Sequence, residues 1–273
     1  MEVTMDVIKA VVLDLDGTLL NSRREVSARS LQALISCYQS GIHMIIATAR
    51  PARSLRMLLP PEMLEMGCII YYNGAHTVDS AYDMEDHLWV EQQTMLELYE
   101  AIMRRNSGQI VSFEVKGTMH CNRSLTPEHA ILLGFPDGTP FPEVCKREEM
   151  NQFLLSKMLL SNDDDIYTEL NLEFGHRVKI MLTDKGRLIQ IMNAGVSKAA
   201  ALMPVLTRRG IHPDHVMVFG DDYNDLELFD MCGYPVAMGN AIDELKLKAK
   251  LMTATNDQDG VAVVLESLLQ THP

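Results

Sequence analysis

Residues 11–20 read VVLDLDGTLL, an apolar run that leads directly into two aspartates and a glycine. The run is continuous rather than alternating, which is typical of a strand that is buried on both faces. A buried carboxylate without a partner is costly, and two carboxylates that lie close together repel each other. Either this segment lies at the surface, where water solvates Asp14 and Asp16, or a positive charge lies between them.

Two further apolar runs end in polar residues in the same way. Residues 42–50 read IHMIIATAR, with the polar end at Thr48, and residues 215–222 read HVMVFGDD. Between the first two runs, residues 27–41 carry apolar positions at helical spacing and end in a glycine. A strand, a helix and a strand in this order form a parallel crossover unit. The sequence therefore predicts an α/β fold with a parallel sheet.

The middle of the chain has a different character. Short strands with alternating character, two of them joined by the hairpin-like sequence TDKGR, are interrupted by two helical segments. The expected strands are residues 87–92, 111–115, 117–122, 155–161, 177–184 and 187–193, and the expected helices are residues 93–106 and 163–174. This pattern indicates an α+β domain at residues 81–189, inserted into an α/β domain that occupies residues 1–80 and 190–273.

The polar ends of the three runs are expected at one edge of the parallel sheet, where ligands bind in such folds. Asp14 and Asp16 are two residues apart, so the period of a strand directs both to the same side. With Asp221 and Asp222, four carboxylates would meet at this edge, and they could not all stay ionised without a cation. A hard divalent ion suits such oxygen ligands, and we expect Mg²⁺. The alternative is that these acids are helix caps or turn residues, which for Asp222 is an equally good interpretation.

The composition narrows the class of protein. The 273 residues carry a formal net charge of −13, which argues against nucleic acid and anionic membrane surfaces as partners. The five cysteines form no CxxC pair, and His212 and His215, the histidine pair whose spacing could suggest a metal site, read as part of a loop because Pro213 lies between them. The N-terminal residues do not read as a signal peptide, and no apolar run is long enough to span a membrane. We therefore expect a cytoplasmic protein with reduced thiols.

Four motifs in order resemble those of the haloacid dehalogenase superfamily of phosphohydrolases. They are DLDGTLL from Asp14, ATAR from Ala47, the lysine of GVSKAAAL, and GDDYNDLELF from Gly220. Three more segments, YNGA (72–75), VAMGNA (236–241) and TNDQDGVA (255–262), are similar to the Cof-type subfamily. The resemblance implies the superfamily's Rossmann-like core with a large α+β cap inserted between the second and third motifs.

The resemblance also implies a phosphatase mechanism. Asp14 is the expected nucleophile, which forms an aspartyl-phosphate that water then hydrolyses. Asp16 is the expected general acid for the leaving oxygen and then the base for water. Mg²⁺ is expected to bind the carboxylates of Asp14 and Asp221 and the backbone carbonyl of Asp16.

The remaining motif residues are expected around the phosphate. Thr48 donates its hydroxyl, helped by the backbone N–H of Ala49 at the start of the next helix. Asp225 orients Lys198 or supports the metal site, and Arg50 either faces the site or pairs with a core acid. The phosphate-binding residues implied by the resemblance are Leu15, Thr48, Ala49, Lys198 and Asn224.

Two residues depart from the subfamily pattern. Ala49 and Ala199 stand where the subfamily usually has glycine. If either position requires a positive φ angle, the alanine is strained, whereas a helical backbone costs nothing.

The expected activity is Mg²⁺-dependent hydrolysis of a small phosphate ester, such as a sugar phosphate or a phosphorylated cofactor. Two alternatives are a sugar phosphomutase, which passes the phosphoryl group to a second hydroxyl, and a non-catalytic phosphate sensor. An intact Asp16 argues against the sensor, because binding alone does not need a general acid. Cap residues such as Lys116, Arg123 and Lys157 could bind the leaving group, but no pattern in the sequence selects them, and the oligomeric state has no sequence signal.

Overall fold

The structure is a computed structural model that describes residues 8–133, 135 and 141–270. The chain divides into two compact units: a core unit, Met1–Asp86 with Ser197–Pro273, and a cap unit, His87–Val196. The cap unit thus begins six residues after the expected residue 81 and ends seven after the expected residue 189. The boundaries differ because hydrogen bonding, rather than local composition, decides which sheet a strand joins.

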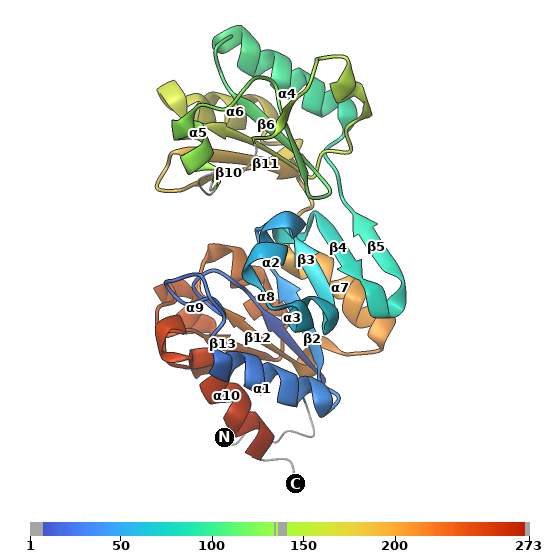
Figure 1. The fold of residues 1–273 in the computed structure, drawn as a ribbon, viewed down its shortest axis with the longest axis vertical. Coiled ribbons are helices and arrows are strands. Elements are labelled where there is room, and N and C mark those ends of the chain that lie inside the picture. Colours follow the sequence, from blue (N-terminus) through green and yellow to red (C-terminus); the bar gives the residue numbers. More distant parts are fainter. Residues whose placement is uncertain (1–7, 134, 136–140, 271–273) are drawn as a thin grey trace. The chain divides into compact units, whose positions relative to one another are not determined.

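The core unit is built on an eight-stranded sheet (Figure 1). In spatial order its strands are β14 (Leu251–Met252), β13 (Tyr234–Ala237), β12 (Val216–Gly220), β1 (Ala10–Leu13), β2 (His43–Ala47), β3 (Gly67–Tyr71), β4 (His76–Asp79) and β5 (Met84–His87). From β14 to β3 all neighbours are parallel, and β4 runs antiparallel to β3. All four residues of β1 are buried, because the strand lies between β12 and β2 at the centre of the sheet. The predicted α/β core with a parallel sheet is confirmed.

Helices lie on both sides of the core sheet (Figure 1). They are α1 (Ala28–Gln39), α2 (Ala52–Leu58), α3 (Pro61–Glu65), α7 (Lys198–Arg209), α8 (Leu226–Met231), α9 (Asp243–Lys248) and α10 (Gly260–Gln270). Helix α1 begins where the Ser27 hydroxyl accepts a hydrogen bond from the backbone N–H of Ser30. It buries Ala33, Leu34 and Cys37 and packs against α10. The apolar helical spacing seen in the sequence therefore faces the core.

The cap unit contains a six-stranded, mainly antiparallel sheet. Its strands are β10 (Val178–Thr183), β11 (Leu188–Asn193), β9 (Lys157–Ser161), β6 (Val111–Val115), β7 (Thr118–Cys121) and β8 (Glu143–Val144), in this spatial order. Its helices are α4 (Gln92–Arg105), α5 (Pro127–Leu132) and α6 (Ile166–Phe174). The TDKGR connection is a hairpin turn, in which Asp184, Lys185 and Gly186 all have positive φ.

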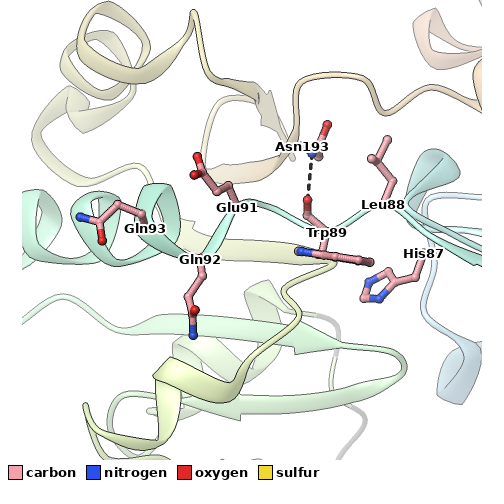
Figure 2. A pocket seen from close by; sticks show the side chains of 7 residues that line it. All are labelled: His87, Leu88, Trp89, Glu91, Gln92, Gln93 and Asn193. Atoms are coloured by element: carbon pink, nitrogen blue, oxygen red, sulfur yellow. Dashed lines mark hydrogen bonds between the residues drawn. The ribbon is translucent and has the colours of Figure 1, made fainter.

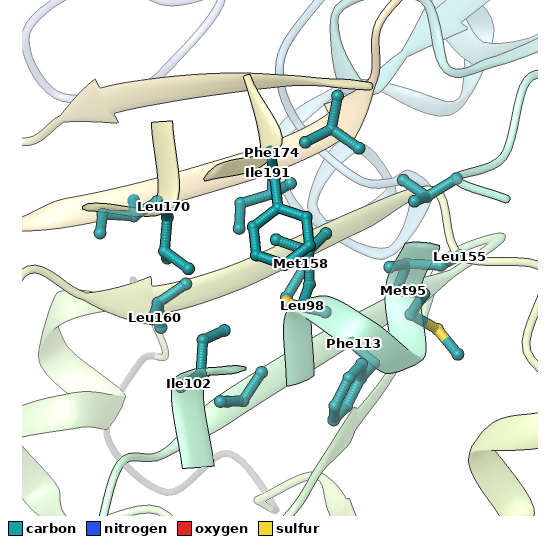
Figure 3. Packing of buried hydrophobic residues seen from close by; sticks show 14 of the residues in the cluster. Met95, Leu98, Ile102, Phe113, Leu155, Met158, Leu160, Leu170, Phe174 and Ile191 are labelled. Atoms are coloured by element: carbon teal, nitrogen blue, oxygen red, sulfur yellow. The ribbon is translucent and has the colours of Figure 1, made fainter. Parts of the chain in front are cut away.

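Helices α4 and α6 pack on one face of the cap sheet (Figure 3). Leu98 and Ile102 from α4 and Phe174 from α6 meet Phe113 and Met158 from the strands, and all five side chains are at least 96% buried. This cluster gives the cap unit a hydrophobic core of its own.

One strand expected from the sequence does not form. Residues 87–92 read as a strand, but β5 ends at His87 and α4 begins at Gln92. Between them the chain is a connector in which Val90 alone bridges to Leu155. The burial does not follow the alternation of the sequence, because the adjacent Leu88 and Trp89 are both exposed and only Val90 is buried.

Two expectations from the composition can be compared with the structure. All five cysteines are buried thiols, and burial raises the pKa of Cys37 to about 11. Among the described residues, no helix is both long and apolar enough to cross a membrane.

Candidate active site

Three chain segments end at the same edge of the core sheet. Asp14 directly follows β1, Thr48 directly follows β2, and Asp221 directly follows β12. Because β1 is parallel to both neighbours, the carboxyl ends of the three strands lie side by side. Asp14 is 5% exposed and Thr48 1% exposed, so neither side chain is simply solvated.

Lys198 joins the third motif to the first and fourth. Its Nζ lies 2.5 Å from Asp14 Oδ1 and 2.7 Å from Asp225 Oδ1, and the three side chains are almost fully buried. Lys198 is the first residue of α7, whose cap is the Ser197 hydroxyl. Although burial alone would lower the pKa of Lys198, the charges of Asp14 and Asp225 raise it, so the ammonium stays protonated.

Asp221 completes an acidic group with Asp14 and Asp225, whose carboxylate oxygens lie within 4.8 Å of one another. The hydroxyl of Thr18 donates to Asp221 Oδ1 at 2.8 Å. Gly17 lies beside the same carboxylate with a φ of +82°, and a side chain at this position would collide with Asp221. The glycine of DLDGT is therefore required by both its backbone angle and its neighbour.

The charges at this edge are not balanced by the protein. The buried carboxylates of Asp14 and Asp225 and the partly buried carboxylate of Asp221 face one ammonium group. Burial, reinforced by Asp225 and Asp221, raises the pKa of Asp14 well above its usual value despite Lys198. Burial also raises the pKa of Asp221 to about 7. A nearby cation would stabilise the ionised form of both carboxylates. Carboxylate oxygens are also the ligands that a hard divalent ion prefers, so these residues fit such an ion.

The hydrogen bonds indicate which carboxylates are available to such an ion. Asp225 uses Oδ1 for Lys198 and Oδ2 for the backbone N–H groups of Asp221 and Asp222. Among the described residues, Asp14 and Asp221 each engage only one of their two oxygens. The side chain of Asp222 accepts from the N–H of Tyr223 and caps the turn that follows, as its alternative interpretation proposed.

Arg50 pairs with the second aspartate of the first motif. Its Nε and a terminal nitrogen each lie 2.6 Å from one oxygen of Asp16. Of the two interpretations that the sequence left open, the contact favours the one in which Arg50 faces the site, because its partner Asp16 has a half-exposed side chain and is not a core acid. With its carboxylate bound to Arg50, Asp16 could reach a metal only through its backbone carbonyl, and that expected contact stays a prediction.

The loop after β2 is held by the YNGA segment. The Thr48 hydroxyl accepts from the N–H of Arg50, and the Thr48 carbonyl accepts from the N–H of Asn73. Tyr72, Asn73 and Gly74 all have positive φ, and the side-chain carbonyl of Asn73 accepts from the Asn224 amide at 3.0 Å. This turn brings the second and fourth motifs together.

Ala49 and Ala199 are not among the residues with positive φ, so neither alanine is strained by its backbone. Ala49 precedes α2 by three residues rather than beginning the helix, because Pro51 caps it. The Leu15 side chain is fully buried, so any contact with phosphate at this position falls to its backbone.

The segments at residues 236–241 and 255–262 donate hydrogen bonds to the first motif. The Asn240 amide donates to the carbonyl of Gly17 at 2.7 Å, and the Asn256 amide donates to that of Leu20 at 2.9 Å. Asp257 accepts from the N–H of Ser22. The sequence had marked these segments only as family features, and it had not identified Thr18, Asn73 or Asn240 as site residues. The N-G pair at Asn73 was the one local signal, since it favours a turn with positive φ.

Comparison with known proteins agrees with this arrangement. The family model described as haloacid dehalogenase-like hydrolase matches residues 11–265. The chain is 27% identical to a 5-amino-6-(5-phospho-D-ribitylamino)uracil phosphatase of Bacillus subtilis, over 96% of this chain and 98% of the relative. It is 26% identical to a phosphoglycolate phosphatase of Archaeoglobus fulgidus, over 95% of this chain and 96% of the relative.

Solved structures share the fold over nearly the whole chain. A haloacid dehalogenase-like hydrolase from Bacteroides thetaiotaomicron has a TM-score of 0.81 at 28% identity and covers 95% of this chain and 98% of its own. A subclass IIB sugar phosphatase has the same fold, with a TM-score of 0.77 at 21% identity, covering 94% of this chain and 98% of its own. The chain therefore belongs to the haloacid dehalogenase-like hydrolases, among the phosphatases of the Cof-type branch.

Proposed function

We propose that this protein is a Mg²⁺-dependent phosphatase that hydrolyses the monoester of a small phosphorylated metabolite through an aspartyl-phosphate on Asp14. The observation that supports it most is the buried contact of Lys198 with both Asp14 and Asp225, next to Asp221. This arrangement holds one oxygen of Asp14 in place and neutralises part of the charge that a phosphoryl group would meet.

In the first step, an oxygen of Asp14 attacks phosphorus and the bond between phosphorus and the ester oxygen breaks. The departing oxygen takes a proton from Asp16 and leaves as the hydroxyl group of the product alcohol. Lys198 and the Thr48 hydroxyl hold the phosphoryl oxygens, while Asn224, positioned by Asn73, contributes a further contact.

In the second step, water attacks the phosphorus of the aspartyl-phosphate. Asp16, now ionised, takes a proton from this water, and the bond between phosphorus and Asp14 breaks to release inorganic phosphate. Both carboxylates then have their starting protonation states. Asp225 keeps Lys198 in register through both steps.

Asp14 and Asp221 are the carboxylates proposed to hold Mg²⁺, together with the backbone carbonyl of Asp16. When bound, this ion supplies charge neutralisation to the transferring phosphoryl group. Asp225 would support the site without direct contact, because both of its oxygens are engaged.

The proposed substrates are sugar phosphates or phosphorylated cofactor precursors, which is the class that the names of the relatives suggest. A phosphomutase or a phosphate sensor would share the same pocket residues. Conversion of one sugar phosphate isomer into another without free phosphate would favour the mutase. Phosphate release below one equivalent across a broad panel of esters would favour the sensor.

The experiment is a phosphate-release screen with the full-length protein over sugar phosphates, nucleotides, flavin mononucleotide and pyridoxal phosphate. We expect turnover with Mg²⁺, loss of turnover with a chelator, and its recovery when Mg²⁺ is restored. Asp14→Asn should abolish turnover, whereas the exposed Asp214→Asn, the same chemical change far from the three strand ends, should not. Undiminished turnover in Asp14→Asn would rule out the assigned nucleophile.

A further inference from the structure

The cap unit contains a cavity of about 630 Å³ that the reaction described above does not use (Figure 2). It is lined by His87, Leu88, Trp89, Glu91, Gln92, Gln93 and Asn193, all from the cap unit. Its volume lies within the range of roughly 300–1,000 Å³ that is usual for small-molecule sites. None of the lysines or arginines that the sequence offered for binding the leaving group lines it.

The main feature of the cavity is a half-exposed aromatic ring. Trp89 is the chain's single tryptophan and is 44% exposed, and the neighbouring Leu88 is 41% exposed. Two adjacent large apolar side chains that stay in contact with solvent at a cavity are informative, because burying them elsewhere would stabilise the fold. Such a surface is suited to contact with a ligand.

Hydrogen bonds fix the backbone around Trp89, and its ring contacts the ring of His87. The Trp89 carbonyl accepts from the Asn193 amide at 2.8 Å, shown by the dashed line in Figure 2. The next residue, Val90, donates to the carbonyl of Leu155 at 2.9 Å. The ring of His87 lies 5.6 Å away at a tilt of 57°, with Nε2 bonded to the hydroxyl of Ser156. The Trp89 backbone and the neighbouring His87 ring are therefore in place before a ligand arrives, which lowers the entropic cost of binding.

The charge of the lining restricts the ligand. Among the described residues, the cavity is lined by one carboxylate, Glu91, and by no lysine or arginine. Glu91 accepts from the Thr94 hydroxyl and lies 3.9 Å from Arg177, so its charge is only partly compensated. A second phosphate would be repelled here, whereas N–H and O–H groups would find acceptors on Glu91 and on the side-chain amides.

From these observations we infer that the cavity binds an uncharged planar ring whose edges carry N–H or O–H groups, stacked on Trp89. The lining residues lie next to the two points where the chain passes between the units, at residues 86–87 and 196–197. If the proposed phosphatase activity is correct, the kinetic test below decides whether this ring belongs to the substrate. That assignment rests on the proposed function, but the binding site does not.

Because Trp89 is the only tryptophan, its fluorescence reports on the cavity in the full-length protein. The probes are uridine, which has a neutral ring with an N–H group, ribitol, which has hydroxyls without a ring, and inorganic phosphate. We expect uridine to change the emission in a saturable way, ribitol to bind more weakly, and phosphate to leave the emission unchanged. A uridine titration without saturable change would overturn the inference.

Variants measured by calorimetry separate stacking from general effects. Trp89→Ala should weaken uridine binding by about tenfold or more, as expected for loss of one stacked ring, whereas Trp89→Phe should retain most of the affinity. Leu172→Ala, at an 87% exposed position on α6, is the control and should bind like the wild type. Equal affinity in Trp89→Ala and the wild type would contradict the site.

Steady-state kinetics then distinguish a ligand that is part of the substrate from a separate effector. Uridine that raises the KM for uridine 5′-phosphate occupies the leaving-group position. Uridine that binds without raising this KM supports the site but makes its ligand a separate effector. If uridine binds and no phosphate ester is hydrolysed, the site stands and the proposed function fails. If esters are hydrolysed and no ring compound binds, the proposed function stands and the binding site fails.

Discussion

The guanidinium group of Arg50 binds both oxygens of the Asp16 side chain, with two contacts of 2.6 Å. Asp16 is itself 49% exposed at its side chain, so without Arg50 the carboxylate would be free to rotate into solvent. The pair couples the first motif to the loop after β2, and the Thr48 hydroxyl fixes the backbone of Arg50. Arg50 is therefore a positioning residue for the proposed general acid.

We expect Arg50→Ala to slow the hydrolysis of alkyl phosphates by about tenfold or more, within the range attributed to general acid catalysis. Hydrolysis of p-nitrophenyl phosphate should change little, because its leaving group needs no proton. The measurement is kcat for esters whose leaving groups differ in pKa. Arg50→Lys should restore the alkyl esters only in part, since lysine keeps the charge but not the two-point contact.

In an Asp16→Asn background the same Arg50→Ala change should have no further effect on the alkyl esters, because the group that it positions is already gone. A uniform loss across all leaving groups would instead assign Arg50 to phosphate binding or to folding.

Lys198 is predicted to stabilise the core unit as well as the reaction. Lys198→Met leaves Asp14 and Asp225 buried without a counter-charge, which typically costs about 3–5 kcal/mol in unfolding free energy. Chemical denaturation in the absence of divalent ions, followed by circular dichroism, measures this cost. Adding Asp14→Asn to Lys198→Met should recover part of the lost stability, because it removes one unpaired charge. If the double variant is less stable than the single, the charge explanation is wrong.

Metal binding is predicted to stabilise the protein independently of activity. A ligand at about 100 times its Kd stabilises the folded state by about 2.7 kcal/mol, so Mg²⁺ above its Kd should raise the unfolding transition with the logarithm of its concentration. Asp221→Asn should remove most of this shift, whereas Asp230→Asn, which changes a surface ion pair with Lys248, should not. A shift of equal size in Asp221→Asn and the wild type would place the metal elsewhere.

The arrangement of the strand ends could be predicted because it depends on short-range patterns. A continuous apolar run that ends in acids defines a buried strand, and parallel pairing then brings Asp14, Thr48 and Asp221 to one edge. The contact between Arg50 and Asp16 could not be decided in this way. Asp16 was expected at the edge, whereas the position of Arg50 was left open, and its contact depends on loop backbone angles that periodicity does not report.

Site residues that the sequence did not identify depend on tertiary contacts. Asn73 meets Asn224 only because Tyr72, Asn73 and Gly74 all take positive φ angles, an arrangement that tertiary contacts impose on Tyr72 against its own preference. The same limit applies in the cap unit. Residues 87–92 have the alternation of a strand, but after β5 ends at His87 they pair with another segment only at Val90, and β8 is too short for any pattern to indicate it.

Another arrangement with no sequence signal gives a prediction for pH. Arg209 donates to Asp79 Oδ2 through two nitrogens and lies 2.6 Å from His43 Nδ1 through a third. Because Arg209 can only donate, Nδ1 must accept, and His43 must be neutral at this atom. Burial and the charge of Arg209 accordingly lower the pKa of His43 from its usual 6.5.

A group whose pKa is lower in the folded state adds stability that is fully present above its unfolded pKa and is lost as the pH falls through its folded pKa. The wild type should therefore lose its stability advantage over His43→Gln as the pH drops below about 6.5. Circular dichroism is the appropriate readout, since Trp89 lies in the cap unit and does not report on the core. His212→Gln, at an exposed histidine beside Asp214, is the control and should show no such decline. A constant difference between wild type and His43→Gln from about pH 8 to about pH 5 would show that the pKa of His43 is the same in the folded and the unfolded chain, against the prediction.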